Sequence, residues 1–151
     1  MLITSIRKRA WSILTRLYPA YLRMVYKMQI GEGGVISWHA HLDKSINPKG
    51  IKIGNYVRIT RGVTLLAHDN CRSIKADCTI GNNCIIGINS IVMPGVTIGN
   101  NVVVAAASVV TKDIPDGCMV AGNPAHIIKT GVKVSDNGKI LSSGEKINNR
   151  F

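Results

Sequence analysis

The sequence predicts an all-β solenoid, in which short strands wind around a filled interior, with a helical segment before it. Branched aliphatic residues recur at six-residue steps through the centre of the chain. Gly and Asn recur beside them at regular intervals. Hydrophobic residues make up 46% of the chain but aromatic residues only 5%. A core of Val, Ile and Ala favours a narrow, tightly wound β structure over a sandwich.

The six-residue period is clearest in the second half of the chain. One column of positions contains Ile80, Ile86, Val92, Ile98, Val104 and Val110. A second column, four residues later, contains the smaller Cys84, Ser90, Val96, Val102 and Ser108. An α-helix turns about 100° per residue, so it cannot keep residues six apart on one side. We therefore expect a triangular coil with three strands per turn, its first column inside and Gly and Asn at corners of positive φ.

The period continues upstream but slips once. Ile53, Ile59 and Leu65 extend the first column, and Ile30, Ile36 and Leu42 extend it more faintly. Leu65 and Ile74 stand nine residues apart instead of six, which predicts a three-residue excess at 67–72. A filled coil has no room for an insertion, so this segment should bulge outwards at a corner. The bulge carries His68 and Asp69.

The two ends of the chain have other patterns. Residues 2–28 predict an amphipathic helix that Pro19 should kink or divide. We favour packing of this helix on the body or on a neighbouring subunit, and contact with anionic lipid stays open as the alternative. Val132, Val134, Asn137-Gly138 and Ile140 indicate a tight hairpin, and the last ten residues should be loose. The predicted apolar stripe of the helix is Ala10, Leu14, Leu17, Tyr21, Val25 and Met28. We therefore divide the chain into an N-terminal amphipathic helical segment (1–30), a coiled β domain (31–130) and a C-terminal hairpin and tail (131–151).

Charge and cysteine usage limit the functional classes. Nineteen Lys and Arg against eight Asp and Glu give a net charge of +11, which favours an anionic partner such as a phosphate-bearing cofactor. No nucleic-acid-binding motif accompanies this charge. The four cysteines form no CxxC pair, which favours buried thiols in a reducing compartment. No apolar run is long enough for a transmembrane helix, and basic residues interrupt any leader-like stretch. We expect a cytoplasmic protein.

Residues 30–130 resemble the hexapeptide-repeat acyltransferases. The likeness is densest over 80–129, where VVTKDIP (109–115) and AGNPA (121–125) are similar to motifs of the maltose/galactoside and polysaccharide O-acetyltransferases. This resemblance implies a left-handed parallel β-helix, an exception to the usual right-handed crossover. It also implies a homotrimer that binds acetyl-CoA in the groove between neighbouring subunits, with no metal.

The resemblance also implies site residues. GVTLLAHD (62–69) resembles the stretch that carries the catalytic histidine, which makes His68 the general base for an attacking hydroxyl. A backbone N–H around Ile88 would stabilise the oxyanion. The positions that match the family's coenzyme A contacts are Ile88, Ala106, Thr111, Lys112 and Lys129. The VAAAS segment (104–108) departs from the more usual IGAGS, so the groove there should be narrower.

Four residues near the start of the coil are candidates for an acceptor site. Trp38, His39, His41 and Asp43 could line an acceptor pocket, with Trp38 stacking on a sugar ring, or could be surface residues of an early coil. Asp69 is a further candidate beside His68. We expect O-acetylation of a sugar or glycan. The alternatives are N-acetylation of an amino-sugar nucleotide, serine O-acetylation, a non-catalytic scaffold and a γ-type carbonic anhydrase, whose zinc would need three histidines.

Overall fold

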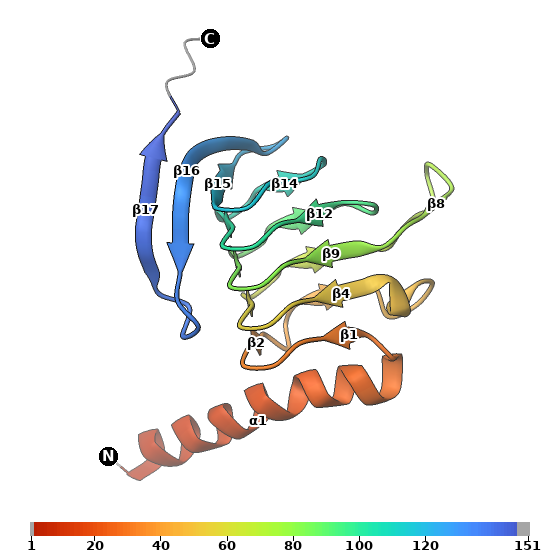
Figure 1. Ribbon diagram of the computed structural model, residues 1–151. Helices are drawn as coiled ribbons and strands as arrows, with labels where there is room; N and C mark the ends of the chain where they lie inside the picture. Colours follow the sequence, from red (N-terminus) through yellow and green to blue (C-terminus); the bar gives the residue numbers. More distant parts are fainter. Residues whose placement is uncertain (1, 148–151) are drawn as a thin grey trace.

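A computed structural model describes residues 2–147, with residues 2–12 and 16 described by their backbone alone. The chain is a left-handed parallel β-helix with one α-helix across its lower end and an antiparallel hairpin along one side (Figure 1). This confirms the fold class that the sequence predicts.

The coils are built from short strands that stack into parallel sheets between residues 29 and 121. Each strand pairs with its equivalent in the next coil: Ile86, for example, pairs with Ile59 on one side and Val104 on the other. One sheet, called A here, contains β1 (Gln29–Ile30), β4 (Ile51–Ile53), β9 (Cys78–Ile80) and β12 (Thr97–Ile98). Sheet B contains β2 (Val35–Ile36), β5 (Arg58–Ile59), β10 (Ile85–Ile86), β13 (Val103–Val104) and β15 (Cys118–Ala121). Sheet C contains β3 (His41–Leu42), β6 (Thr64–Leu65), β11 (Ile91–Val92) and β14 (Val109–Val110).

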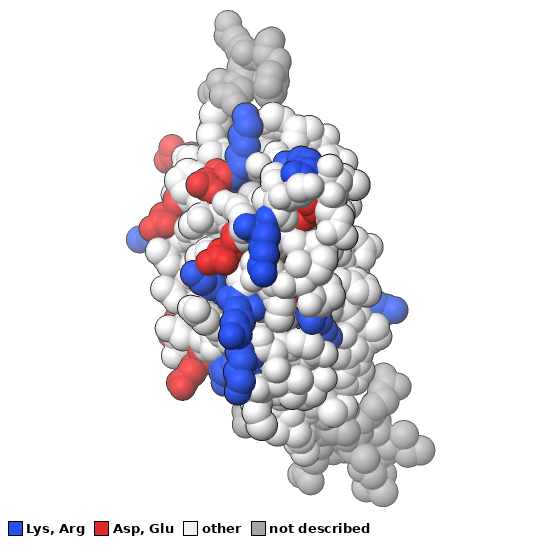
Figure 2. Space-filling model, turned by 90° about the vertical axis from the view of Figure 1, so that its right-hand side faces the viewer, with Lys and Arg blue, Asp and Glu red and all other residues white. Residues whose placement is uncertain are grey.

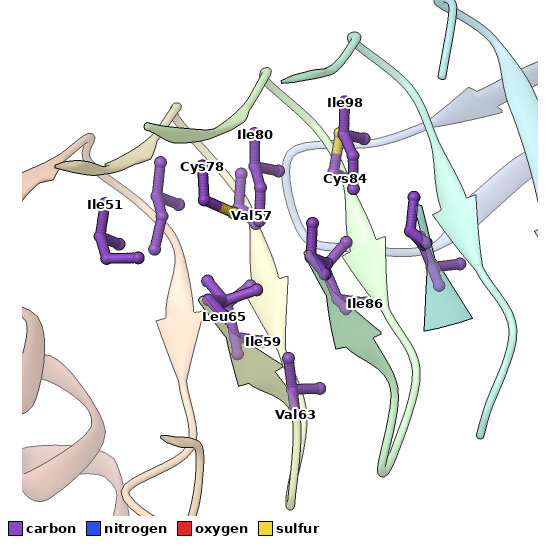
Figure 3. Packing of buried hydrophobic residues seen from close by; sticks show 14 of the residues in the cluster. Ile51, Val57, Ile59, Val63, Leu65, Cys78, Ile80, Cys84, Ile86 and Ile98 are labelled. Carbon is purple, nitrogen blue, oxygen red and sulfur yellow. The ribbon is translucent and has the colours of Figure 1, made fainter. Parts of the chain in front are cut away.

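The predicted columns form the core. Ile59 and Ile86 are at most 1% exposed and lie side by side inside neighbouring coils (Figure 3). The second column is buried as well, with Cys84, Ser90 and Ser108 fully enclosed. The Ser90 hydroxyl donates to the carbonyl oxygen of Ala105 at 2.8 Å, which satisfies its polar group inside the coil.

Gly and Asn occupy the corners for two different reasons, whereas the sequence predicted positive φ for both. Asn83 and Asn101 do adopt positive φ, at 56° and 55°. Gly81 does not, although the prediction placed Gly at positive-φ corners. A Cβ on Gly81 would lie 2.7 Å from the carbonyl oxygen of Gly99 in the next coil. This glycine is therefore needed because two backbones approach closely.

Helix α1 (Leu2–Tyr26) lies across the first coil and continues through Pro19, so the predicted division of the helix is wrong. Leu22 is fully buried, and Tyr18 and Tyr26 pack against the core. The predicted apolar stripe faces away from the coil, so the β-helix of this chain covers another face of the helix. Leu14, Leu17, Tyr21 and Val25 are 44–58% exposed, whereas Met28, just beyond the helix, is buried. The side chain of Ala10 lies outside the described part of the chain. Packing on a neighbouring subunit and contact with lipid stay predictions for the exposed stripe. No helix among the described residues is long and apolar enough to span a bilayer.

The C-terminal hairpin consists of β16 (His126–Val134) and β17 (Ile140–Lys146), which confirms the predicted turn around Asn137-Gly138. β16 pairs with β15, and then Val132 and Val134 pack against Val103 on the outside of sheet B. The hairpin therefore runs beside several coils (Figure 1). The expectation of ten loose C-terminal residues is wrong for 142–146, because these residues belong to β17.

Candidate functional site

Two loops leave the coil at the same corner, between sheets C and A. Residues 43–50, which end in the short 3-10 helix η1 (Pro48–Gly50), join β3 to β4, and residues 66–77 join β6 to β9. Ile80, and not Ile74, continues the first column after Leu65, since it pairs with Ile53 in sheet A. The predicted three-residue excess is therefore too small. Ile74 lies instead in β8 (Ile74–Lys75), which pairs antiparallel with β7 (His68–Asp69) outside the coil.

The two loops are bonded to one another. The side-chain amide of Asn47 donates to the carbonyl oxygen of Ala67 at 3.1 Å. Ala67 itself is fully buried, so the residue before His68 is anchored in the core. This contact fixes the start of the second loop relative to the first. The side chains that follow Leu42 and Ala67 are consequently brought together.

His68 and Asp43 form the centre of this corner. The Nδ1–H of His68 donates to Oδ2 of Asp43. The Asp43 side chain is entirely buried, and the His68 side chain is 18% exposed. The other carboxylate oxygen of Asp43 accepts from the backbone N–H of Ser45 at 3.3 Å and of Ile46 at 3.2 Å. A buried, fully bonded carboxylate thus holds a partly accessible imidazole in one orientation.

The environment of Asp43 keeps its carboxyl group charged. Burial by itself raises the pKa of Asp43, but the hydrogen bonds from His68 and from the backbone N–H groups of Ile46 and Ser45 outweigh this effect. The net pKa of Asp43 lies below its ordinary value. The sequence suggested that Asp43 contacts the substrate that accepts the acetyl group. In the structure its carboxylate is buried and bonded to His68.

Asp69 has a structural contact of its own. Its carboxylate accepts from Arg72 Nε at 2.7 Å and from the backbone N–H of Cys71 at 2.9 Å. These bonds, the Arg72 bonds first, lower the pKa of Asp69. They also close the turn of the β7–β8 hairpin, so Asp69 shapes the loop that carries His68.

The predicted cofactor residues lie at different places on the coil. Thr111 and Lys112 are exposed and follow β14, at the same corner as His68. Ile88, which is 45% exposed, and Ala106 lie at the corner between sheets B and C. Lys129 is half-buried on β16. One chain does not bring all five residues together at one corner.

Charge on the loop side of the molecule suits a phosphate-bearing ligand. Figure 2 faces the side from which the two loops project, and Lys and Arg side chains run along its middle while acidic side chains gather towards one edge. The two loops contribute the exposed Lys49, Arg72 and Lys75. Arg72 is paired with Asp69, but the excess of positive charge on this side still attracts phosphates.

Two of the remaining acceptor candidates, Trp38 and His39, lie at a different corner from His68. Trp38 and His39 lie between β2 and β3, at the corner between sheets B and C, where the Trp38 indole N–H donates to Nε2 of His39 at 3.1 Å. His39 lines a hollow of about 360 Å³ with Arg58 and Arg61. His41 is exposed on β3. Among the described residues, no three His, Cys, Asp or Glu side chains converge as a metal site would require.

Sequence reasoning missed the pairing of Asp43 with His68. The available signal was a second break in the period: Leu42 and Ile53 are inward residues of neighbouring strands and stand eleven residues apart instead of six. Two insertions that follow the same sheet must lie at the same corner. Asp43 and His68, which these insertions carry, are therefore neighbours although they are 25 positions apart in the sequence.

Comparison with known proteins agrees with this architecture. Residues 77–112 match the model of the bacterial transferase hexapeptide (six repeats) family. Protein CapG of Staphylococcus aureus is 55% identical over 93 residues, covering 55% of this chain and 54% of CapG. The chain thus spans about half the length of CapG. The protein YvoF of Bacillus subtilis (strain 168) is 34% identical over 127 residues, covering 82% of this chain and 70% of YvoF.

A solved structure gives the same picture. Galactoside acetyltransferase in complex with coenzyme A superposes with a TM-score of 0.58 at 27% identity, covering 75% of this chain and 69% of that protein. The repeat match, the 34% identity that spans most of YvoF and this shared fold agree with one another. The chain therefore belongs to the bacterial hexapeptide transferase family.

Proposed function

We propose that this protein is an acetyl-CoA-dependent O-acetyltransferase that acts on a hydroxyl group of a sugar or glycan. The observation that carries the proposal is the pairing of His68 with the buried Asp43 carboxylate at an open corner of a hexapeptide-family β-helix. The similarity to galactoside acetyltransferase, with its bound coenzyme A, supports both the donor and the class of acceptor.

In the proposed reaction, Nδ1–H of His68 stays bonded to Asp43, which leaves Nε2 as the basic nitrogen. Nε2 takes the proton of the acceptor hydroxyl while that oxygen attacks the thioester carbonyl carbon. The carbon–sulfur bond then breaks, and the imidazolium returns the proton to the departing thiolate. The Asp43 carboxylate stabilises the imidazolium between these steps. A backbone N–H near Ile88 is proposed to stabilise the oxyanion.

We propose that three chains form a homotrimer and that each site is built from two of them. His68, Thr111 and Lys112 lie at one corner, whereas Ile88 and Ala106 lie at another, so a groove between neighbours would unite them. Coenzyme A would lie in this groove, with its phosphates near Lys112 and Lys129. Trp38, His39 and His41 are the proposed acceptor contacts, and the arginines beside His39 favour an anionic acceptor.

The proposed location is the cytoplasm, at the inner face of the membrane. Acetyl-CoA is available there, and the buried thiols of Cys78, Cys84 and Cys118 are unpaired. N-acetylation of an amino sugar would use the same base and donor. It differs only in the acceptor group.

The test is a screen of sugars, glycans, amino-sugar nucleotides and serine with acetyl-CoA, followed by detection of released thiol and by mass spectrometry of the product. We expect a mass gain of one acetyl group on a hydroxyl of a sugar. His68→Ala should lose turnover, whereas His126→Ala, which changes an exposed histidine on β16, should keep it. Equal turnover by His68→Ala, or acetylation of amines alone, would contradict the proposal.

A further inference from the structure

Helix α1 has two apolar faces, and the β-helix covers only one of them. Leu22 is fully buried on the covered face, between the half-buried Tyr18 and Tyr26. The other face carries large apolar side chains that are 44–70% exposed. These residues, called the outer stripe here, are Ile13, Leu14, Leu17, Tyr21, Met24 and Val25. At 100° per residue they fall within a sector of about 120°, so they form one continuous surface.

The position of α1 turns the outer stripe away from the rest of the molecule. The helix lies across the end of the solenoid formed by the first coil (Figure 1). Its covered face meets β1 and β2, so the opposite face points outwards along the solenoid axis. A face at the end of the solenoid can meet a flat surface without interference from the coils.

The segment that carries the outer stripe has charged residues of one sign in its sequence. The first 31 residues contain six basic residues and no Asp or Glu. These are Arg7, Lys8, Arg9, Arg16, Arg23 and Lys27. An apolar helix face within a segment that is exclusively basic fits the interface of an anionic membrane, where the apolar side chains enter the acyl boundary and the cations meet lipid phosphates.

We propose that the outer stripe of α1 docks the protein on anionic lipid bilayers. The helix lies in the plane of the membrane surface and does not cross it. The inference extends the proposed function, since it rests on the homotrimer for its strength: three chains with parallel axes would present three outer stripes in one plane, and weak contacts would add. A protein copy with the same basic helix would be repelled by like charge, which favours lipid as the occupant.

Docking would also place the site near the membrane. Lys44, the neighbour of Asp43, donates to the hydroxyl of Tyr18 on α1 at 3.0 Å and lies 5.4 Å from the centre of its ring. The loop that orients His68 is therefore fastened to the docking helix. An acceptor held at the bilayer surface would meet the His68 corner from that end of the molecule.

The test is sedimentation of the full chain with vesicles of phosphatidylcholine alone and with about 30% phosphatidylglycerol. We expect binding to the anionic vesicles only, weakened about ten-fold or more by raising the salt from about 0.05 to about 0.5 M. Leu17→Glu and Met24→Glu should each weaken binding by about ten-fold or more, because each replaces an apolar side chain that would enter the membrane interface by a charge. Leu141→Glu is the matched control, since Leu141 is 69% exposed on β17.

Three results would overturn the docking proposal. The first is equal binding to both kinds of vesicle or to neither, and the second is equal loss of binding in Leu141→Glu. The third is a change in the mass of the lipid-free assembly in Leu17→Glu or Met24→Glu, which would make the outer stripe a contact between protein copies. Thiol release without lipid separates this proposal from the catalytic one: the stripe variants should keep it, and His68→Ala should lose it while still binding vesicles.

Discussion

Asn47 donates a hydrogen bond from its side-chain amide to the carbonyl oxygen of Ala67, across 20 positions of sequence. Ala67 immediately precedes His68, and Asn47 lies in the loop that begins with Asp43. This single contact therefore joins the segment that carries the proposed base to the segment that carries its carboxylate. The two insertions act as one unit at their shared corner.

Replacement of Asn47 by Ala tests this connection. We expect Asn47→Ala to lower kcat by about ten-fold with little change in the KM for acetyl-CoA, because the orientation of His68 is affected and the proposed cofactor contacts are not. Steady-state kinetics with both substrates measures the two constants. Lys146→Ala, an exposed change on β17, is the control. A rise in KM alone would show that Asn47 serves the cofactor instead.

The buried carboxylate predicts a pH-dependent contribution to stability. The pKa of Asp43 is lowered in the folded chain, relative to about 3.9 when unfolded. The unfolded state therefore binds more protons, and the contribution is fully present above about pH 4 and is lost as the pH falls through the lower, folded pKa. Asp43→Asn should reduce the free energy of unfolding by about 1–3 kcal/mol at neutral pH.

Urea unfolding of both proteins at neutral pH and at about pH 3 measures this difference. The gap between the wild type and Asp43→Asn should narrow at the acidic pH. A gap of the same size at both values would mean that the charge of Asp43 contributes nothing and that the substitution acts through packing.

The cysteines predict a simple pattern of reactivity. Burial raises the pKa of Cys78 to about 12 and of Cys84 to about 11, and it raises the pKa of Cys118 as well. Cys71 is exposed in the β7–β8 turn. Since the thiolate is the reactive form, the folded protein should titrate one thiol with a chromogenic disulfide and the unfolded protein four.

Cys71→Ser should remove the fast reaction and leave three thiols after unfolding. This variant also lowers the background of the thiol-release assay. Fast reaction of a second thiol in the folded protein would contradict the burial of the inner column.

The core column predicts a large penalty for truncation. Ile86 is completely buried between Ile59 and Val104, so Ile86→Ala should leave a cavity and destabilise the protein by about 2–5 kcal/mol. Ile140→Ala, at a site that is 46% exposed on β17, should cost less than about 1 kcal/mol. Chemical denaturation compares the two, and similar losses would contradict the assigned interior of the coil.

The repeat could be predicted from sequence because it is a local pattern. Each inward residue such as Ile86 contributes to a column whether or not its partners in space are known, and the position of His68 outside the coil followed from a break in that column. The hairpin at Asn137-Gly138 was predictable for the same reason, since turn residues act over a few positions.

The parts that failed depend on contacts between distant segments. Ile74 fits the hydrophobic pattern but pairs with Asp69 in a hairpin outside the coil. Spacing alone cannot distinguish an inward position of the coil from a position in such a hairpin. The stripe of α1 was real, yet the helix has a second apolar face around Leu22, and only the shape of the first coil decides which face is covered. The pairing of Asp43 with His68 required both loops to be placed at one corner.

A double-mutant cycle on Asp43 and His68 tests the central claim most directly. If Asp43 acts by orienting His68, Asp43→Asn should lower kcat about 100-fold in the wild-type background and should have no further effect in His68→Ala. Turnover of acetyl-CoA by the wild type, the two single variants and the double variant provides the four values. Equal losses from Asp43→Asn in both backgrounds would show that the two residues act independently and would contradict the account.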